Sequence, residues 1–290
     1  TRFSCMLAAL QAAAAWECDR PHDAATVLAD RLDILEHSGL PESLLLAYRT
    51  LARMAAAEGA EHRALELLEA LDAVGAARRL PRLRIATLPE QVRLHAGRSR
   101  SQSCREPCER IDALWRDDGL PQGPLWRQGV ALLREVAQGY AAIAAKDWRY
   151  ALEPLARADE LARELKQGRL RIELLALPAF PLDRCGEDSQ TRLREAVDLA
   201  DTYGLRRVFA DAHPDLGDWV DRVAADGPRR SVPVPPAARP AEEEEELPRP
   251  ATAYGMVLTP KGREVLVLLA RNLSNKEIGR AMQVGETTIK

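Results

Sequence analysis

Aromatic residues are scarce in this chain: three Phe, five Tyr and five Trp amount to 4% of its 290 residues. Runs of Val and Ile are also few, so little in the sequence favours β-sheet. The apolar share is nevertheless 46% and consists mainly of Ala and Leu. Because Ala, Leu, Arg and Glu all favour helix, the composition predicts an all-α fold with ample apolar material for a packed core.

A disulfide framework, a membrane span and a strong charge imbalance are missing as well. The cysteines are odd in number and dispersed, which favours the reducing cytoplasm; they are Cys5, Cys18, Cys104, Cys108 and Cys185. No apolar run approaches the ~18–20 residues that span a bilayer. Lys and Arg number 41 and Asp and Glu 44, a net charge of -3. Nucleic-acid binding would therefore need a local basic region.

The clearest boundary along the chain is a stretch rich in proline and charge, residues 227–253. It contains the run Glu242 to Glu246 and seven prolines between positions 228 and 250. Proline is unfavourable in the interior of a helix, and the glutamates repel one another. We therefore expect a stiff, solvated linker between residues 1–226 and residues 254–290.

Residues 1–226 show a weak repeat with a period near 40. Its mark is a small residue followed by Leu or Cys four positions later, at Ala24/Leu28, Ala64/Leu68, Cys104/Cys108, Ala151/Leu155 and Ser189/Leu193. Leu-Pro follows the first three pairs at a constant offset, at positions 40–41, 80–81 and 120–121. Arg82-Leu83-Arg84-Ile85 also matches Arg169-Leu170-Arg171-Ile172. Small residues let neighbouring helices approach closely, so the pattern predicts stacked helical hairpins. The spacing favours a superhelix of degenerate tetratricopeptide-like (TPR-like) units that serves in sensing or oligomerisation.

Several constellations permit a functional and a structural interpretation. Cys104 and Cys108 lack the further ligands of a zinc site, so core packing is favoured. Trp115, Trp126 and Trp148 could line a ligand groove, but burial in the repeats is the favoured alternative. The arginine-rich segment 78–100 fits an interaction face and a solvated surface equally well. Asp117-Asp118 and Asp211/Asp215 are interpreted as loop acids. No hydrolytic constellation is found, so the chain is expected not to be an enzyme.

The C-terminal residues 254–290 carry helix start and stop signals in close succession. Thr259-Pro260 opens a helix, because Thr is a good N-cap and Pro suits the first helical position. Ser274 and Glu277 form a capping box for a second helix. Gly285 permits a tight turn before a third. This layout predicts a helix-turn-helix domain.

The same residues resemble the LuxR (GerE-type) DNA-binding domain. Gly262 departs from the family, which usually has Glu there, and weakens the first helix by about 1 kcal/mol relative to Ala. The matching segments, in the family's order and spacing, are Leu258-Thr259-Pro260, Arg263-Glu264-Val265-Leu266, Leu273-Ser274-Asn275-Lys276-Glu277-Ile278 and Thr288-Ile289-Lys290. The resemblance implies a cytoplasmic, DNA-binding transcriptional activator.

A weaker resemblance precedes the linker. Residues 194–200, 203–205 and 207–211 look like the end of the helical repeats in MalT-like regulators, which are large ATP-binding LuxR-type activators. In that group a nucleotide-binding module precedes the repeats. The chain contains no phosphate-binding G-x-x-x-x-G-K-[ST] motif, so no cofactor is expected in it and ATP would belong to an upstream module.

DNA contacts are expected at five residues: Asn275, Lys276, Thr287, Thr288 and Lys290. By resemblance, the first two contact the DNA backbone and the last faces the groove, where it could reach a base edge or a phosphate. The threonines lie where a helix N-terminus offers free N–H groups to phosphate oxygens. The alternative for each residue is a solvated charge or a simple cap. Residues 256–290 carry six basic and three acidic residues, +3 against -6 elsewhere, which fits a basic DNA-binding domain.

The recognition helix of the LuxR family continues beyond the point that matches Lys290. Four helical residues nucleate poorly, so we expect this chain to bind DNA weakly and without sequence preference. Because the sequence starts at Thr1 and not at Met, we also expect the chain to be a fragment of a longer protein. The resemblance implies double-stranded promoter DNA and RNA polymerase as partners, an inducer or protein at the repeats, homo-oligomers and no membrane. The alternatives are a TPR-like protein–protein adaptor and an ATPase switch completed by an upstream module.

Overall fold

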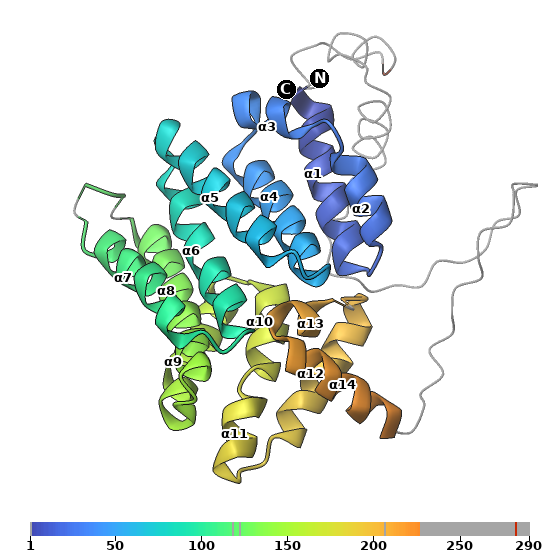
Figure 1. Ribbon diagram of the computed structural model, residues 1–290, viewed down its shortest axis with the longest axis vertical. Helices are drawn as coiled ribbons and strands as arrows, with labels where there is room; N and C mark the ends of the chain where they lie inside the picture. The colour runs from blue at the N-terminus through green and yellow to red at the C-terminus, as the bar shows by residue number, and fades with distance from the viewer. Residues whose placement is uncertain (1, 118, 122, 206, 227–281, 283–290) are drawn as a thin grey trace, which may run out of the picture. The chain divides into compact units, whose positions relative to one another are not determined.

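The computed structural model describes residues 2–117, 119–121, 123–205, 207–226 and 282. These residues form helices and turns without any strand, so the predicted all-α fold is confirmed for this part of the chain (Figure 1). The described helices belong to one compact unit, residues 2–227, here called the helical unit. Apart from Met282, the expected linker and helix-turn-helix lie outside the described residues. The helices are α1 (Arg2–Glu17), α2 (Pro21–Leu28), α3 (Leu32–Ser38), α4 (Pro41–Ala57), α5 (Glu61–Ala77), α6 (Pro81–Ala96), α7 (Ser101–Trp115), α8 (Pro124–Ala144), α9 (Trp148–Glu164), α10 (Gly168–Ala176), α11 (Ala179–Cys185), α12 (Gln190–Tyr203), α13 (Val208–Ala212) and α14 (Pro214–Asp226).

Proline marks several helix starts. Pro41 and Pro81 occupy the first turns of α4 and α6, as the Leu-Pro repeat predicts. A missing N–H costs nothing there, because the first-turn donors have no partner inside the helix. The third Leu-Pro pair is different: Pro121 lies in a loop, and α8 begins at Pro124. The repeat therefore predicts two of these three starts.

The turns between helices recur with a fixed spacing. Gly59, Arg79 and Ser99 have positive φ and lie 20 residues apart, and so do Lys146, Lys166 and Gly186. At each of these turns the next amide donates to a carbonyl five residues back, as in Ala60 N to Ala55 O and Asp147 N to Ala142 O. This is the hydrogen bond of a Schellman helix end. Two helices, each with its turn spanning 20 residues, give the period near 40, and the gap before Lys146 is the longer interval of the repeat.

The residues that define the repeat form the seams between helices. Consecutive helices from α4 to α9 pack on one another and follow the chain order in Figure 1. Ala64 and Leu68 on α5 are buried, as are Ala151 and Leu155 on α9; Cys104 is also buried, and Cys108 partly so. A Cβ on Gly139 of α8 would lie 2.5 Å from Leu155 Cδ2, so glycine permits the close approach of α8 and α9. The residues of the repeat therefore lie where consecutive helices pack on one another.

An ion pair recurs with the repeat. Arg84 Nε on α6 lies 3.2 Å from Asp72 Oδ1 on α5, and Arg171 Nε on α10 lies 3.3 Å from Asp159 Oδ1 on α9. Both arginines belong to the matching Arg-Leu-Arg-Ile segments. The same pair therefore links the same two helices of two hairpins, which supports the sequence alignment of these copies.

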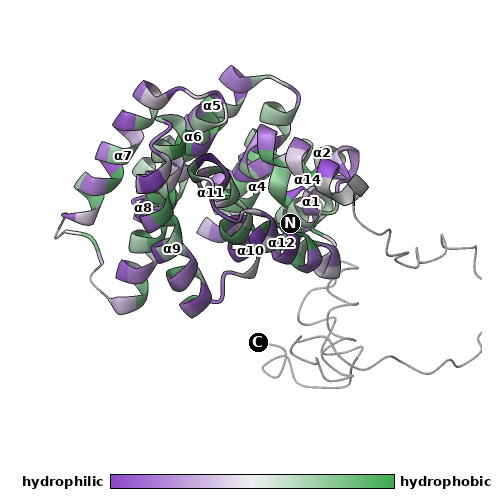
Figure 2. Cartoon of the chain, turned by 90° about the horizontal axis from the view of Figure 1, so that it is seen from below, coloured by the Kyte–Doolittle hydropathy of each residue, from purple (hydrophilic) through white to green (hydrophobic). Residues whose placement is uncertain are grey.

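Two apolar cores lie within the helical unit. One joins α1 to α5 with parts of α6, and the other runs from Leu88 on α6 to Val220 on α14. Figure 2 shows the corresponding pattern, with apolar residues turned toward neighbouring helices and polar residues outward. None of the helices in the described ranges has both the length and the apolar character needed to cross a bilayer.

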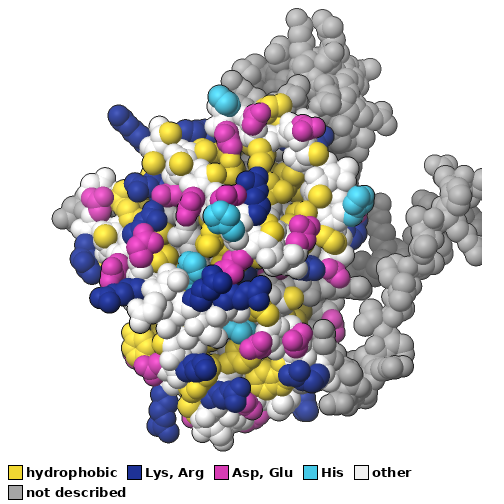
Figure 3. Space-filling model, in the orientation of Figure 1, with side chains coloured by type: hydrophobic (Ala, Val, Ile, Leu, Met, Phe, Trp, Pro, Cys, Tyr) yellow, Lys and Arg dark blue, Asp and Glu magenta, His cyan; other side chains and the backbone are white. Residues whose placement is uncertain are grey.

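Arginines of the segment 78–100 bridge neighbouring hairpins. Arg82 pairs with Glu42, and Arg100 Nη1 lies 2.7 Å from Glu61 Oε1. Arg78 donates to the carbonyls of Glu36 and Gly39. On the face in Figure 3, basic and acidic side chains are interspersed. Arg82 and Arg100 are thus exposed side chains that also form intramolecular pairs, which agrees with a solvated surface.

Candidate ligand-binding site in the helical unit

A layer of charged side chains lies where α1, α4, α6, α10 and α13 meet. We call it the inner charge cluster; it comprises Glu17, Arg53, Glu90, Arg93, Arg169, Glu173 and Asp211. Its members are mostly buried between the two apolar cores. Charges in such a place must be paired and hydrogen-bonded, because desolvation costs several kcal/mol per ion.

Arg53 on α4 makes three of these contacts. Its Nη2 lies 2.8 Å from Glu90 Oε1, and its Nη1 lies 3.3 Å from Asp211 Oδ2 and 3.5 Å from Glu17 Oε1. The side chain is only 5% exposed. Arg53 therefore links helices from the beginning, middle and end of the helical unit.

Asp211 joins the last helices to the first. Its Oδ2 accepts a 2.8 Å hydrogen bond from Trp16 Nε1 on α1 and lies 3.4 Å from Arg169 Nη2 on α10. The guanidinium of Arg207 stacks 4.0 Å above the Trp16 ring. These contacts join the last helices of the helical unit to its first helix, since Trp16 and Asp211 lie near opposite ends of its sequence.

Arginine charges set the ionisation of the cluster. Burial alone would raise the pKa of Glu90, but Arg53, Arg93 and Arg49 outweigh it and hold that pKa well below its ordinary 4.5. Burial and the charge of Glu173 raise the pKa of the Tyr140 hydroxyl, which donates a 2.6 Å hydrogen bond to Glu173 Oε1. At neutral pH Glu90 is therefore charged and Tyr140 is protonated.

The lowered pKa of Glu90 makes stability depend on pH. Above pH 4.5 the carboxylate is ionised in both folded and unfolded chains; below it the unfolded chain takes up the proton first. The unaltered chain should have a higher free energy of unfolding than Glu90→Gln. This difference should be constant above pH 5 and should shrink by about 1.4 kcal/mol per pH unit below pH 4.5. Urea unfolding from pH 7 to pH 3 measures it. Glu69→Gln, at an exposed position of α5, is the control; a difference for Glu90→Gln that stays constant across this range would contradict the prediction.

A cavity of about 450 Å³ opens beside the inner charge cluster, between α4, α6, α8 and α10. We call it the inner cavity. Five arginines and two glutamates line it, together with apolar side chains mainly from α6 and α8. The charged residues are Arg49, Arg53, Arg82, Glu90, Arg93, Arg169 and Glu173. Its volume lies within the range of small-molecule sites.

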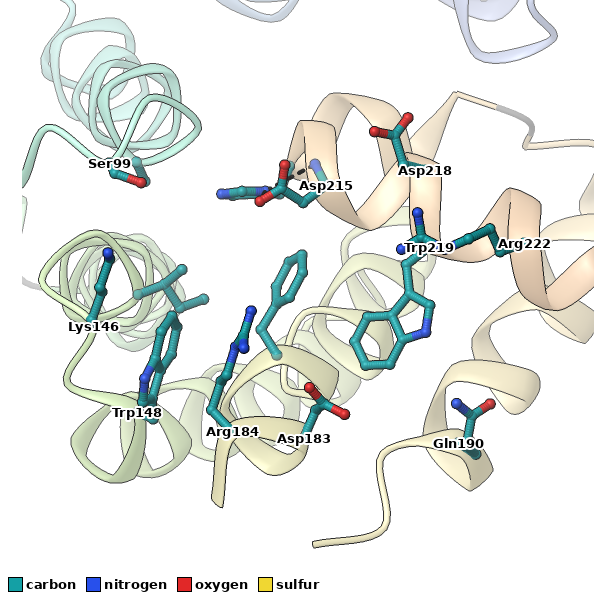
Figure 4. A pocket seen from close by; sticks show the side chains of 14 residues that line it. Ser99, Lys146, Trp148, Asp183, Arg184, Gln190, Asp215, Asp218, Trp219 and Arg222 are labelled. Atoms are coloured by element: carbon teal, nitrogen blue, oxygen red, sulfur yellow. Dashed lines mark hydrogen bonds and ion pairs between the residues drawn. The ribbon is translucent and has the colours of Figure 1, made fainter. Parts of the chain in front are cut away.

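A second, larger hollow of about 830 Å³ lies between α8, α9, α11 and α14; we call it the outer hollow. In Figure 4, Lys146 and Trp148 form one wall, and Asp215, Asp218 and Trp219 of α14 form the opposite one. The Phe180 ring lies 4.9 Å from that of His213 and 5.8 Å from that of Trp219.

His213 is the buried titratable group of the outer hollow. Burial lowers its pKa below the ordinary 6.5. Its Nδ1 accepts a 3.2 Å hydrogen bond from the Asp215 amide, which fits a neutral imidazole with the proton on Nε2. The outer hollow thus offers aromatic faces and charges of both signs.

The expected DNA-contacting residues Asn275, Lys276, Thr287, Thr288 and Lys290 lie outside the described residues. The cysteine prediction can be examined: burial raises the pKa of Cys104 to about 11 and that of Cys108 to about 12. Both thiols thus remain protonated near neutral pH, as expected of core residues. In the described part of the chain, no group of His, Cys, Asp and Glu could hold a metal ion.

Other sequence interpretations need correction. Trp126 is only partly buried and lines the inner cavity. Trp148 is also partly buried; it packs against an apolar core and lines the outer hollow. Trp115 is also partly buried and stacks with Arg127. Asp211 is not a loop acid but a buried residue of α13, because the arginines of other helices surround its carboxylate.

Comparison of the chain with known protein families, curated proteins and solved structures finds no match. The inner charge cluster and the inner cavity are candidate functional features that the sequence analysis does not identify. One signal was present, namely arginine and glutamate at positions of α4, α6 and α10 that otherwise alternate with buried apolar residues. That signal identifies unusual residues, but it cannot show which helices meet.

Proposed function

We propose that this chain is part of a ligand-responsive, DNA-binding transcriptional regulator of the LuxR/MalT-like type. The observation that carries the proposal is the set of four C-terminal segments from Leu258 to Lys290 that follow the order and spacing of the LuxR domain. Their basic excess suits binding to DNA phosphates. We assign the DNA contacts to Asn275, Lys276, Thr287, Thr288 and Lys290.

The helical unit is the sensing part in this proposal. Its hairpins act as a TPR-like superhelix, and the inner cavity receives an inducer while outer surfaces serve a protein partner or a second copy. The support comes from the 20-residue spacing of the turns and from a cavity of suitable volume. Inducer binding changes self-association in the cytoplasm, and the paired DNA-binding domains then recruit RNA polymerase to a promoter.

DNA binding can be measured without knowing the promoter. A chain that continues past Lys290 is used to select duplexes from a random pool, and fluorescence anisotropy then compares it with the present chain at several salt concentrations. The longer chain should enrich a defined half-site, and the present chain should bind weakly to all duplexes. Lys276→Ala and Lys290→Ala should each reduce the salt slope of affinity by about one.

Arg105→Ala supplies the matched control, because Arg105 is an exposed arginine of α7 in the helical unit. Its salt slope should equal that of the unaltered chain. If the longer chain has no salt-dependent affinity for duplex DNA, the regulator proposal is overturned. The protein–protein adaptor then becomes the better account of the helical unit.

A further inference from the structure

Arg49 differs from the other arginines that line the inner cavity. Arg53, Arg82, Arg93 and Arg169 each pair with at least one carboxylate. Arg49 is partly buried on α4, one turn before Arg53. None of the described residues accepts a hydrogen bond from its side chain or forms an ion pair with it. Its guanidinium therefore lines the cavity without a carboxylate of its own.

The surroundings of Arg49 disfavour its charged form. Burial, followed by the positive charge of Arg53, lowers the pKa of Arg49 to about 10. Glu90, whose charge counteracts this lowering, already pairs with Arg53 and Arg93. A bound anion would offset this repulsion, because charge-assisted hydrogen bonds to a guanidinium are strong in a partly desolvated site.

A second arginine and an apolar surface also line the inner cavity. Arg93 is only 8% exposed, and its Nη2 is buried without a hydrogen-bond partner. Helix α8 contributes Trp126, Val130 and Leu133 to the lining. The cavity thus offers guanidinium groups for an anion and an apolar surface of α8 for an apolar body.

We propose that the inner cavity binds a small organic anion, with its carboxylate or phosphate group at Arg49 and its apolar body against α8. Five arginines against two glutamates favour an anion over a neutral or cationic ligand. The volume of about 450 Å³ admits a small molecule with a modest apolar body. The proposal names the class of ligand that the sensing site would bind. Only the role of this ligand in regulation rests on the proposed function.

Isothermal titration calorimetry on the full chain tests this assignment. The probes are octanoate and octyl phosphate below their micelle-forming concentrations, with 1-octanol as the neutral match and inorganic phosphate as the anion without an apolar body. Both organic anions should bind, and octanol and inorganic phosphate should each bind at least tenfold more weakly. Equal affinity of octanol and octanoate would overturn the anion site. Equal affinity of inorganic and octyl phosphate would overturn the apolar part.

Arg49→Met should weaken octanoate binding roughly tenfold to hundredfold. The unliganded variant should unfold at an unchanged or higher temperature, because an unpaired, desolvated charge has been removed. Arg105→Met, at an exposed arginine of α7, should leave the affinity unchanged. Unchanged octanoate affinity of Arg49→Met would contradict the proposal, as would a lower unfolding temperature without loss of binding.

A second variant keeps the test independent of α4. Leu133→Trp adds volume to the α8 wall and should abolish octanoate binding while Arg49 stays in place. Retained binding by Leu133→Trp would place the ligand elsewhere and overturn the assignment. Since no DNA is present in these titrations, a negative result leaves the proposed DNA-binding function standing, and failure of DNA binding leaves the anion site standing.

Discussion

Arg53→Met is expected to lower the free energy of unfolding by about 3–5 kcal/mol. Methionine fills much of the same space, so the loss comes from the carboxylates that remain. Glu90, Glu17 and Asp211 would lose one shared cation while staying largely buried. Urea unfolding followed by circular dichroism measures the effect near neutral pH.

Arg63→Met provides the matched control for this measurement. Arg63 pairs with Glu66 on the surface of α5, where its side chain is 63% exposed. Exposed ion pairs contribute at most about 1 kcal/mol. If Arg53→Met were as mild as Arg63→Met, the inner charge cluster would be solvated in the folded chain, contrary to the burial of its members.

A double-mutant cycle with Asp211→Asn separates pairing from simple loss of packing. Arg53 and Asp211 share a contact of 3.3 Å, although they lie on α4 and α13. Residues in one ionic network are strongly non-additive. The cost of Arg53→Met should therefore be smaller in the Asp211→Asn background than in the unaltered chain.

Local features of the helical unit could be predicted from its sequence. Ala151 and Leu155 recur at the spacing of one helical turn, and such a pattern can only place both on the same buried face. Pro41 and Pro81 likewise mark helix starts, because proline suits a first turn, although Pro89, Pro107 and Pro154 lie inside helices. These inferences concern residues close together in sequence, where geometry leaves few choices.

Long-range closure could not be predicted in the same way. Arg82 and Arg169 occupy matching positions of two repeat copies, yet Arg82 pairs with Glu42 on the surface and Arg169 joins the inner charge cluster. The difference arises because Glu17 of α1 and Asp211 of α13 reach Arg169, whereas Arg82 meets Glu42 of α4. A repeat pattern contains no information about that return of the chain, so Asp211 was mistaken for a loop acid.

The same closure connects the candidate site with stability. Glu90 and Arg93 belong to both the inner charge cluster and the lining of the inner cavity. A ligand that neutralises Arg49 would therefore act on charges that hold α4, α6 and α13 together. If the proposed ligand binds, its affinity and the packing of α13 on α4 and α6 should therefore be coupled.

Leu155→Ala is expected to destabilise the helical unit by roughly 2–5 kcal/mol. Leu155 is fully buried on α9 and packs against the backbone of α8 at Gly139, so truncation leaves a cavity in the seam. Leu68→Ala, at the matching repeat position on α5, should cost a similar amount because Leu68 is 1% exposed. Leu10→Ala is the control, since Leu10 is 53% exposed on α1.

The two variants also test whether the helical unit unfolds as one body. Leu68 and Leu155 belong to different apolar cores, and an open stack of hairpins could lose one core before the other. The inner charge cluster ties the cores together through Arg53 and Asp211. Each variant should therefore shift a single urea transition without changing its slope. Two separate transitions would show that the cluster does not hold the ends of the helical unit together.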